Sequence, residues 1–216
     1  MEDTSFLIPL TRAGFRVSWV SKIADVDVVA DRDEAMSRLM PHHVKEALKL
    51  CGQENLFWRC EQVHGNIVVP VSGEYVASQV KGADGLATND PKVTLGIHVA
   101  DCGAIYLGDP VQKAVSVIHS GRVGTEKNIL SEAIRVMQEN YGTNPQDLIV
   151  SLAPCIRPPV YEVDFAAMIQ KQALATGVLA ENYHDCKICT TSDSSCYYSY
   201  RQEQGKTGRM LALISL

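Results

Sequence analysis

The sequence has 216 residues, of which 46% are hydrophobic and 21% are charged, a balance that supports a folded core and excludes a globally disordered chain. Its formal net charge is −5 and its 20 lysines and arginines form no basic run, which argues against a nucleic-acid-binding surface. The opening segment, MEDTSFLIPLTRAGF, lacks the basic and long apolar regions of a signal peptide, and no apolar stretch approaches a membrane span.

The length favours one domain over residues 1–216, since about 100–200 residues are typical of a domain. The seven cysteines are an odd number in a chain with no secretory signal. We therefore expect thiols or metal ligands in a reducing compartment, and a cytoplasmic location.

The first helical pattern is DRDEAMSRLMPHHVKEALKLCG, residues 31–52. Proline lacks the backbone N–H that a helix interior needs, so Pro41 predicts an interruption between two helical pieces. His42 and His43 are expected on an exposed part of this pattern. An acidic cluster precedes and begins it, and we interpret this cluster as a solvated loop and not as a magnesium site. Its members are Asp25, Asp27, Asp31 and Asp33.

Short strands separated by turn signals are predicted at residues 93–99, 104–107 and 113–118. A helix is predicted from Glu126 to Tyr141, because its apolar residues recur on one face and Gly142 ends the pattern.

Three further elements complete the prediction. LIVSLAP, residues 148–154, and the final TGRMLALISL read as buried strands, and VDFAAMIQKQALATG reads as a helix with Asp164 as its N-cap. Strands outnumber helices and many connections are tight. The chain is therefore expected to be an α+β protein, with mixed sheets and flanking helices in layers.

Three strand ends carry a metal-competent side chain close to a glycine. They are QVHGN with His64, ADCG with Cys102 and IHSG with His119. If these strand ends meet, two imidazoles and a thiolate converge, which is the ligand set of a catalytic zinc site with one open position. The ligands lie far apart in the sequence, so a structural role for each histidine remains the alternative.

The segment SGRVGTEKN follows His119 and predicts a turn into a new helix. Unpaired N–H groups and the helix dipole attract anions there, and Arg122 adds a charged donor. Phosphate is therefore a candidate ligand near Gly121 and Thr125. The alternative is an ordinary strand-to-helix turn in which Thr125 is the N-cap.

Six ordered blocks carry a family resemblance. They are CEQVHGN, GADGLATNDP, VADCGAIYLGDP, SVIHSG, LAPCIRPPVYEVD and CYYSYRQEQGKTGRMLALISL. From about residue 57 to the end, the chain resembles the YfiH/laccase-domain family. This family is also described as the polyphenol oxidase laccase-domain or FAMIN-like purine nucleoside phosphorylase family.

The resemblance implies a layered α/β sandwich similar to the catalytic domain of cytotoxic necrotizing factors. It implies a zinc ion on His64, Cys102 and His119, and phosphorolysis of purine nucleosides, deamination of adenosine, or both. We accordingly assign catalytic roles to Cys102, His119 and Arg122. Substrate-binding roles are assigned to Gln62, Gly121, Thr125 and Arg201, with a purine nucleoside and phosphate as the expected partners.

The chain is a divergent member in two places. The family loop His-Ala-Gly-Trp-Arg-Gly is His-Ser-Gly-Arg-Val-Gly here, so the Trp position is Arg122 and the Arg position is Val123. The family's Arg-x-Gly-Gly-x-Ser segment near the N-terminus has no clear counterpart. These changes leave the metal ligands in place and alter the surroundings of the substrate.

Other functions remain open. Cys102 with His119 as its base would suit a cysteine hydrolase, since a nearby imidazole favours the thiolate. A metal- or nucleotide-binding relative with altered catalysis is a second alternative, and single-copper phenol oxidation at the same ligands is a minor one. The six histidines are too few for a multicopper oxidase, which lines a trinuclear cluster with many imidazoles.

Some further residues receive structural interpretations. His98 is interpreted as a core histidine, Asp101 as a supporting carboxylate and Asp84 as a turn residue. The pair Cys186 and Cys189 in CKIC is interpreted as ordinary thiols, because a structural zinc site needs four ligands.

Overall fold

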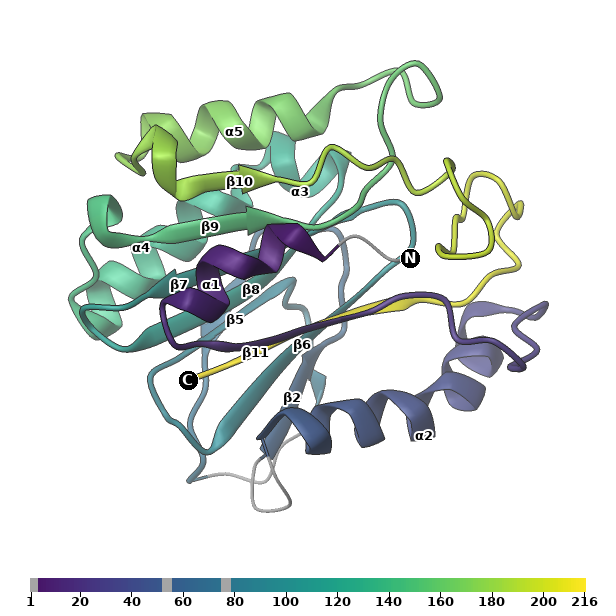
Figure 1. The fold of residues 1–216 in the computed structure, drawn as a ribbon, viewed down its shortest axis with the longest axis horizontal. Helices are drawn as coiled ribbons and strands as arrows, with labels where there is room; N and C mark the ends of the chain where they lie inside the picture. The colour runs from purple at the N-terminus through teal and green to yellow at the C-terminus, as the bar shows by residue number, and fades with distance from the viewer. Residues whose placement is uncertain (1–3, 52–55, 75–78) are drawn as a thin grey trace.

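A computed structural model describes residues 4–51, 56–74 and 79–216. Within these residues the strands form two sheets that pack face to face (Figure 1). Sheet A has the order β1 (Arg16–Val20), β11 (Met210–Ser215), β6 (Val93–Val99), β2 (Leu56–Cys60) and β4 (Gln79–Val80). Sheet B has the order β10 (Tyr183–Asp185), β9 (Ile149–Leu152), β7 (Gly103–Asp109), β8 (Ala114–Ser120), β5 (Gly85–Thr88) and β3 (Val68–Pro70).

Both sheets are mixed. In sheet A, β2 runs parallel to β6 and β4, whereas β11 runs antiparallel to β6 and β1. In sheet B, β7, β8, β5 and β9 pair antiparallel, with parallel edge strands β3 and β10. This arrangement confirms the predicted α+β class with mixed sheets.

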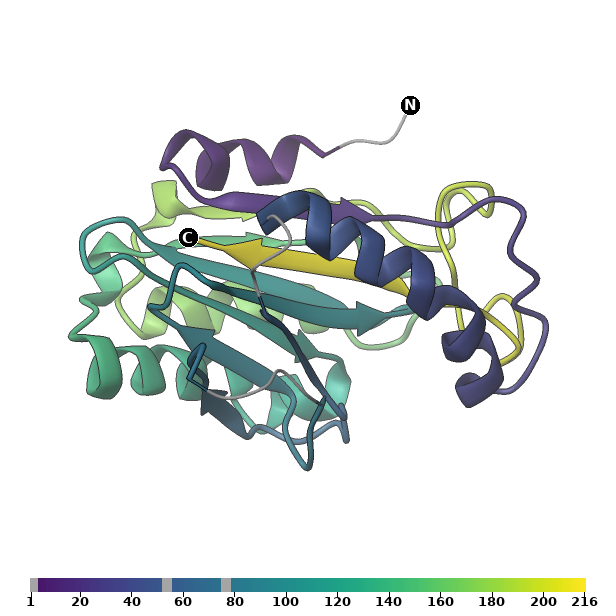
Figure 2. The ribbon, with the colours of Figure 1, turned by 90° about the horizontal axis from the view of Figure 1, so that it is seen from below.

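Helices cover the outer face of each sheet. In Figure 1, α2 (Arg32–Cys51) lies outside sheet A, and α4 (Ile129–Tyr141) and α5 (Phe165–Ala175) lie on the opposite side, outside sheet B. Figure 2, seen from below, shows α2 crossing the strands of sheet A. The short helices are α1 (Ile8–Arg12) and α3 (Arg122–Glu126), with 3-10 turns at Ser5–Leu7, Pro145–Asp147 and Ala180–Asn182. None of the helices in the described part of the chain combines the length and hydrophobicity needed to cross a bilayer.

The core has an inner and an outer layer. Between the sheets, Ile97 of β6 and Ile214 of β11 pack with Tyr106 of β7 and Val117 of β8. On the far side of sheet B, Ile118 and neighbouring side chains pack against α4 and α5. Because both faces of sheet B are covered, its central strands β7 and β8 are buried along their whole length and mostly apolar, which explains their clear signal in the sequence.

Helix ends follow local chemistry. The Asp164 side chain accepts a hydrogen bond from the Ala167 N–H at 3.0 Å and caps α5, as predicted. Gly142 adopts a φ of 72° and ends α4, a left-handed conformation that favours glycine. The predicted helix from Glu126 to Tyr141 is therefore confirmed over Ile129–Tyr141, with the separate α3 before it.

One prediction about α2 is wrong. The helix runs without interruption from Arg32 to Cys51, with Pro41 inside it. Pro41 and Ser37 are both exposed, so the carbonyl that loses its helical hydrogen bond faces water and the cost is reduced. His42 is exposed as expected, but His43 is buried against sheet A, which corrects the prediction for that residue.

Candidate metal centre

The structure brings the three predicted ligands together from separate connections. His64 lies in the segment from β2 to β3, Cys102 in the turn from β6 to β7, and His119 near the end of β8. The first two of these connections carry the chain from sheet A to sheet B. The ligand atoms of the three side chains all lie within 4.8 Å of one another. Among the described residues, this is the group of histidine, cysteine and acidic side chains that could hold a metal ion.

Asp84 supports two of these ligands, which corrects its interpretation as a turn residue. The buried carboxylate accepts a hydrogen bond from His119 Nδ1 at 2.8 Å. It also accepts the backbone N–H groups of Val63, His64 and Gly65, at 3.2, 2.9 and 2.7 Å. His119 is thus oriented with Nε2 on the side of Cys102, and the segment that carries His64 is held in place.

The sequence contains a signal for this role. Asp84 directly precedes β5, which pairs with β8, and the Ile118–Gly85 register places it beside His119. A metal-ligating histidine usually donates its second N–H to a carboxylate or a carbonyl. The carboxylate of the GADG block was therefore a candidate partner for a ligand histidine, which the turn interpretation did not consider.

Charge at the centre favours a thiolate beside an imidazolium. Burial alone would raise the pKa of Cys102, but the charge and hydrogen bonds of His119 and His64 outweigh burial and lower it. Burial alone would lower the pKa of His119, but the Cys102 thiolate and the Asp84 carboxylate outweigh burial and raise it. The protein therefore prepares the deprotonated sulfur that a metal ion or a nucleophilic mechanism requires.

Two backbone features allow this close approach. A Cβ atom on Gly121 would overlap Cys102 Sγ, so the residue after Ser120 has to be glycine for the thiol to sit here. His64 has a φ of 60°, a left-handed conformation that is uncommon outside glycine and is held by the bond from its N–H to Asp84.

Gln62 is locked by the backbone of β6. Its Nε2 donates to the His98 carbonyl at 2.6 Å, and its Oε1 accepts the His98 N–H at 2.9 Å. Gln62 lines the same cavity as the metal ligands, but its amide already has backbone partners. Its predicted contact with substrate stays a prediction, and the visible role of Gln62 is to fix the segment that leads to His64.

The segment after His119 forms the five-residue α3, and its polar groups already have partners. Thr125 Oγ1 donates to the Gly121 carbonyl and lies 2.8 Å from Ser120 Oγ. Arg122 Nε donates to Glu126 at 3.0 Å, and its Nη1 lies 3.9 Å from Glu162. Arg122 lines the cavity, whereas Gly121 and Thr125 are not among its lining residues.

A cavity of about 1070 Å³ opens beside the metal ligands. Its rim includes Tyr161, Tyr200 and Arg201, and the Arg201 guanidinium lies 5.2 Å from the centre of the Tyr161 ring. Arg201 also lies 3.4 Å from Glu162. The cavity continues past the metal ligands to the N-terminal end of α2, where it is lined by Arg32, Met36, Met40, Arg59, His98 and Arg209.

Asp101 holds the tail of the chain at the rim of this cavity. Its carboxylate accepts Thr190 Oγ1 at 2.6 Å and the Arg201 N–H at 2.7 Å. Asp101 has a φ of 80°, and it anchors the segment that presents Tyr200 and Arg201. Its interpretation as a supporting carboxylate agrees with these contacts.

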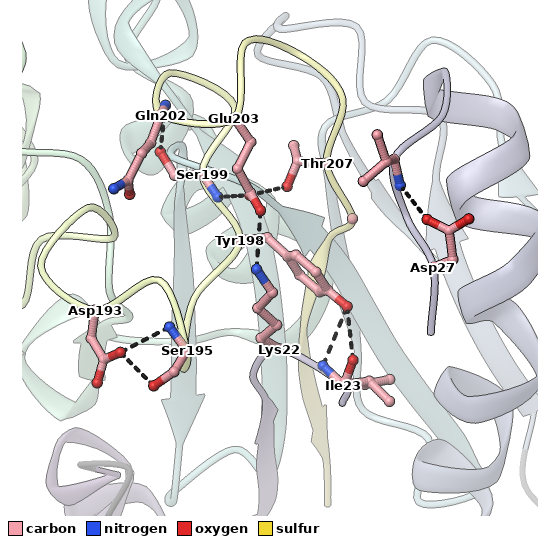
Figure 3. Close-up of polar contacts among 12 residues, drawn as sticks. Lys22, Ile23, Asp27, Asp193, Ser195, Tyr198, Ser199, Gln202, Glu203 and Thr207 are labelled. Carbon is pink, nitrogen blue, oxygen red and sulfur yellow. Dashed lines mark hydrogen bonds and ion pairs between the residues drawn. The ribbon is translucent and has the colours of Figure 1, made fainter. Parts of the chain in front are cut away.

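A second set of hydrogen bonds connects the segment around Tyr200 and Arg201 to residues near the N-terminus (Figure 3). Glu203 accepts the Lys22 ammonium at 3.0 Å, the Ser199 N–H at 2.9 Å and the Thr207 hydroxyl. Tyr198 adds contacts to the backbone of Ile23 at 3.3 Å. The rim residues are thus attached to the N-terminal part of the chain.

The remaining sequence candidates are not metal ligands in this arrangement. His98 lines the α2 end of the cavity and faces His43, with 3.2 Å between His98 Nε2 and His43 Nδ1. Cys186 and Cys189 lie near β10, and they join no group of three or more potential ligands among the described residues. Sequence analysis considered Asp84 only as a turn residue and did not single out Arg32 and Arg59.

Comparisons with known proteins identify the family of this chain. The family model described as "Multi-copper polyphenol oxidoreductase laccase" matches residues 26–170 and 161–216. The purine nucleoside phosphorylase YlmD of Bacillus subtilis is 31% identical over 166 residues, which cover 63% of this chain and 60% of that protein. The purine nucleoside phosphorylase of Deinococcus radiodurans is 30% identical over 185 residues, which cover 74% of this chain and 70% of that protein.

The fold is shared with solved structures. The crystal structure of YlmD from Geobacillus stearothermophilus superposes with a TM-score of 0.82 and 25% identity, covering 94% of this chain and 92% of that one. The YfiH structure from Bacillus licheniformis has a TM-score of 0.78 at 22% identity, covering 91% of this chain and 88% of that one, and it supports the fold alone. The resemblance inferred from the six sequence blocks is confirmed.

Proposed function

The chain belongs to the multi-copper polyphenol oxidoreductase laccase family, and from that premise we propose that it is a zinc-dependent enzyme that cleaves purine nucleosides with phosphate. The observation that carries this proposal is the convergence of His64, Cys102 and His119 at the wall of a large cavity. Relatives named purine nucleoside phosphorylase supply the substrate class.

The residues present fit a zinc ion. Two imidazoles and a thiolate are a ligand set that zinc uses in catalytic sites with an open fourth position. The hydrogen bond of His119 Nδ1 to Asp84 leaves Nε2 for the metal, and the lowered pKa of Cys102 supplies the thiolate. Zinc held in this way supplies Lewis acidity, which polarises a substrate oxygen or acidifies a water molecule.

The protein's own residues would position the substrate. The cavity is large enough for a nucleoside together with phosphate, since ligand cavities of about 300–1,000 Å³ are typical. Tyr161 and Tyr200 offer aromatic faces at the rim on which a purine can stack, and Arg201 lies beside Tyr161. Arg122 and Arg201 have Glu162 as a common partner, and they would orient polar groups of the ligand at this end.

Deamination of adenosine is a second activity that the same centre supports, since it requires a water molecule activated at a Lewis acid. The lowered pKa of Cys102 also favours one different function, a cysteine hydrolase with Cys102 as nucleophile and His119 as base. Metal occupancy separates these candidates, because a thiolate that binds zinc is not free to attack a substrate.

The test is metal analysis of the purified protein together with nucleoside assays. We expect stoichiometric zinc, and base release from inosine, guanosine or adenosine only when phosphate is present. Ammonia release from adenosine without phosphate would assign deamination instead. Protein without metal whose activity is lost on alkylation of Cys102 would assign the hydrolase, and stoichiometric zinc without turnover would assign a binding protein.

A further inference from the structure

The interface between α2 and sheet A has two chemically different halves. Near the C-terminal end of α2, Ala47 packs with Leu211 and Leu213 of β11, and with Phe57 and Leu50. Near its N-terminal end, α2 instead covers arginine and histidine side chains. This second half opens into the cavity that contains the metal ligands.

The strand register places these basic side chains on one face. Arg59 of β2 pairs with Gly96, two residues before His98, and His98 pairs with Leu211 of β11. Arg209 lies two residues before Leu211. Since alternate residues of a strand share a face, Arg59, His98 and Leu211 lie on the face of sheet A that α2 covers. Arg209 directly precedes β11 and lines the same cavity as Arg59 and His98. Arg32, the first residue of α2, completes what we call the arginine cluster: Arg32, Arg59 and Arg209.

None of these three guanidinium groups has a carboxylate partner in the described structure. Arg32 Nη2 donates to the Glu61 carbonyl at 2.9 Å, and Arg59 Nη1 points to Met40 Sδ at 3.4 Å. Arg209 Nη1 donates to the carbonyls of Thr207 and Gly208 at 3.0 and 2.8 Å. Asp33, Glu61 and Asp101 also line the cavity, but no ion pair within 4.0 Å joins one of them to the cluster among the described residues.

The other arginines of the cavity differ in this respect. Arg122 pairs with Glu126 and Glu162, and Arg201 pairs with Glu162. The positive charge of the cluster is therefore only partly compensated among the described residues. Arg59 and Arg209 are partly buried, whereas Arg32 is exposed. A partly buried guanidinium group without a carboxylate partner keeps a charge that a bound anion would compensate.

The nearby histidines do not change this balance. Burial lowers the pKa of His43 to about 4, and burial together with His43 and the cluster arginines lowers the pKa of His98. Both imidazoles are therefore neutral near pH 7, and they bond to each other. Burial also lowers the pKa of Arg59. Burial and the charge of Arg32 lower the pKa of Arg209, although Cys102, Tyr200 and Asp101 act in the opposite direction.

We propose that Arg32, Arg59 and Arg209 form the binding site for a phosphate group in the same cavity as the metal ligands. The proposal rests on the proposed function and moves the phosphate away from the segment after His119, where Thr125 and Arg122 already have partners. Guanidinium groups suit phosphate because their N–H pairs match its oxygens. Arg59 donates to the thioether sulfur of Met40, which is a weak acceptor, so a phosphate oxygen would readily replace it.

The ligand is either inorganic phosphate, the co-substrate of phosphorolysis, or the phosphate of a nucleotide. Both present the same oxyanion. Titration calorimetry of the metal-loaded protein with inorganic phosphate, adenosine 5′-monophosphate and adenosine distinguishes them. Inorganic phosphate that binds alone indicates the co-substrate, and binding of the monophosphate without binding of inorganic phosphate indicates a nucleotide.

Three single variants, Arg32→Gln, Arg59→Gln and Arg209→Gln, test the site. Each is expected to weaken binding of the phosphate ligand by about 10- to 100-fold, as for the loss of a charge-assisted hydrogen bond. Arg209→Lys keeps the charge without the planar fork and is expected to bind with intermediate affinity. Arg135→Gln is the matched control, because the Arg135 side chain is exposed on the outer side of α4 and pairs with Glu132 and Glu139.

The outcomes separate this proposal from the proposed function, because binding is measured without turnover. Unchanged phosphate affinity in all three folded variants, verified by circular dichroism, would overturn the arginine site. An unchanged KM for phosphate in these variants would do the same while phosphorolysis stands. Phosphate binding that depends on the cluster in a protein that cleaves no nucleoside would leave the site intact and remove the proposed function.

Discussion

The two ends of the cavity differ in how their charged groups are paired. At the metal end, each charged group has a partner of opposite charge, as in His119 with Asp84 and Cys102 with the two imidazoles. At the arginine end, the partners of Arg32, Arg59 and Arg209 among the described residues are carbonyl oxygens, a thioether and the ring of Phe57, and no carboxylate forms an ion pair with them. The protein thus arranges its metal ligands in advance, whereas it leaves a positive charge for a ligand to neutralise.

This difference indicates how the two ends respond to mutation. Groups at the metal end act through one another, so the loss of one partner disturbs the others. Groups at the arginine end act on a ligand that the protein does not supply. Changes at the metal end are therefore expected to alter metal binding and stability, and changes at the arginine end to alter ligand affinity.

The largest effect is expected from removal of a metal ligand. In His119→Ala, zinc content measured by mass spectrometry should fall well below one ion per chain. Turnover should fall by about 10³-fold or more, because a Lewis acid stabilises a transition state by several kcal/mol. Cys196→Ser, a change at a cysteine outside the metal group, is the control. Full zinc content in His119→Ala would show that the trio is not the metal site.

A smaller effect is expected for the residue that orients the ligands. Asp84→Asn should weaken zinc binding by about 10- to 100-fold, as for other partners of metal-ligating histidines. Competition with a chelator measures this affinity. Asp90→Asn is the matched control, since Asp90 also accepts backbone N–H groups, from Gly73 and Lys92, but lies outside the metal group. Equal zinc affinities of the two variants would contradict the role of Asp84.

The pH dependence of Cys102 alkylation tests the electrostatic account of the metal end. Removal of the metal should leave a thiol that iodoacetamide alkylates below about pH 8.5, the ordinary thiol pKa, because His119 and His64 lower the pKa of Cys102 against the effect of burial. The thiolate fraction rises as the pH passes this lowered pKa, and zinc should block the reaction.

Cys60 and Cys155 provide internal controls for this experiment. Burial raises the pKa of both thiols, so peptide mass spectrometry should find them unmodified in the folded protein. In His119→Ala, labelling of Cys102 should move to higher pH. A Cys102 profile that titrates like an ordinary exposed thiol would contradict the electrostatic account of the centre.

The smallest effect is expected at the rim. Glu203→Gln removes the charge that binds Lys22, Ser199 and Thr207, and should lower the free energy of unfolding by about 1 kcal/mol, since the pair is partly exposed. Denaturant unfolding measures the loss, with the exposed Glu181→Gln as control. Despite its partial burial, the pKa of Glu203 is lowered by these bonds, so the loss should shrink as the pH falls through that pKa.

Local chemistry was predictable from the sequence. The helix capped by Asp164 and the helix ended by Gly142 appear where their caps place them. The central strands β7, β8 and β9 of sheet B are mostly apolar because both of their faces are covered, so their positions were also clear, whereas β3, β5 and β10 were not predicted. The prediction failed at Pro41, where the exposure of one helix face decides the cost of a proline and the sequence does not show which face is exposed.

The candidate site was predictable only in part, because the sequence does not show which residues become neighbours in the folded chain. His64, Cys102 and His119 belong to separate blocks with recognisable patterns, so they could be proposed as ligands. Asp84 was missed because its role depends on its position beside β8. Arg59 and Arg209 were not predicted as neighbours, because the pairing of β2 and β11 with β6 brings them together from positions 150 residues apart in the chain.

The positions of the ligands in the chain imply that a bound metal ion would also affect stability. His64 and Cys102 lie in connections where the chain leaves sheet A and enters sheet B, and His119 belongs to sheet B itself. An ion bound to all three would therefore cross-link the two halves of the sandwich. Metal at 1,000 times its dissociation constant would stabilise the folded state by about 4 kcal/mol. By the same linkage, any substitution that loosens the packing between the sheets weakens metal affinity, so the metal supply of the cell would set how much of this protein stays folded.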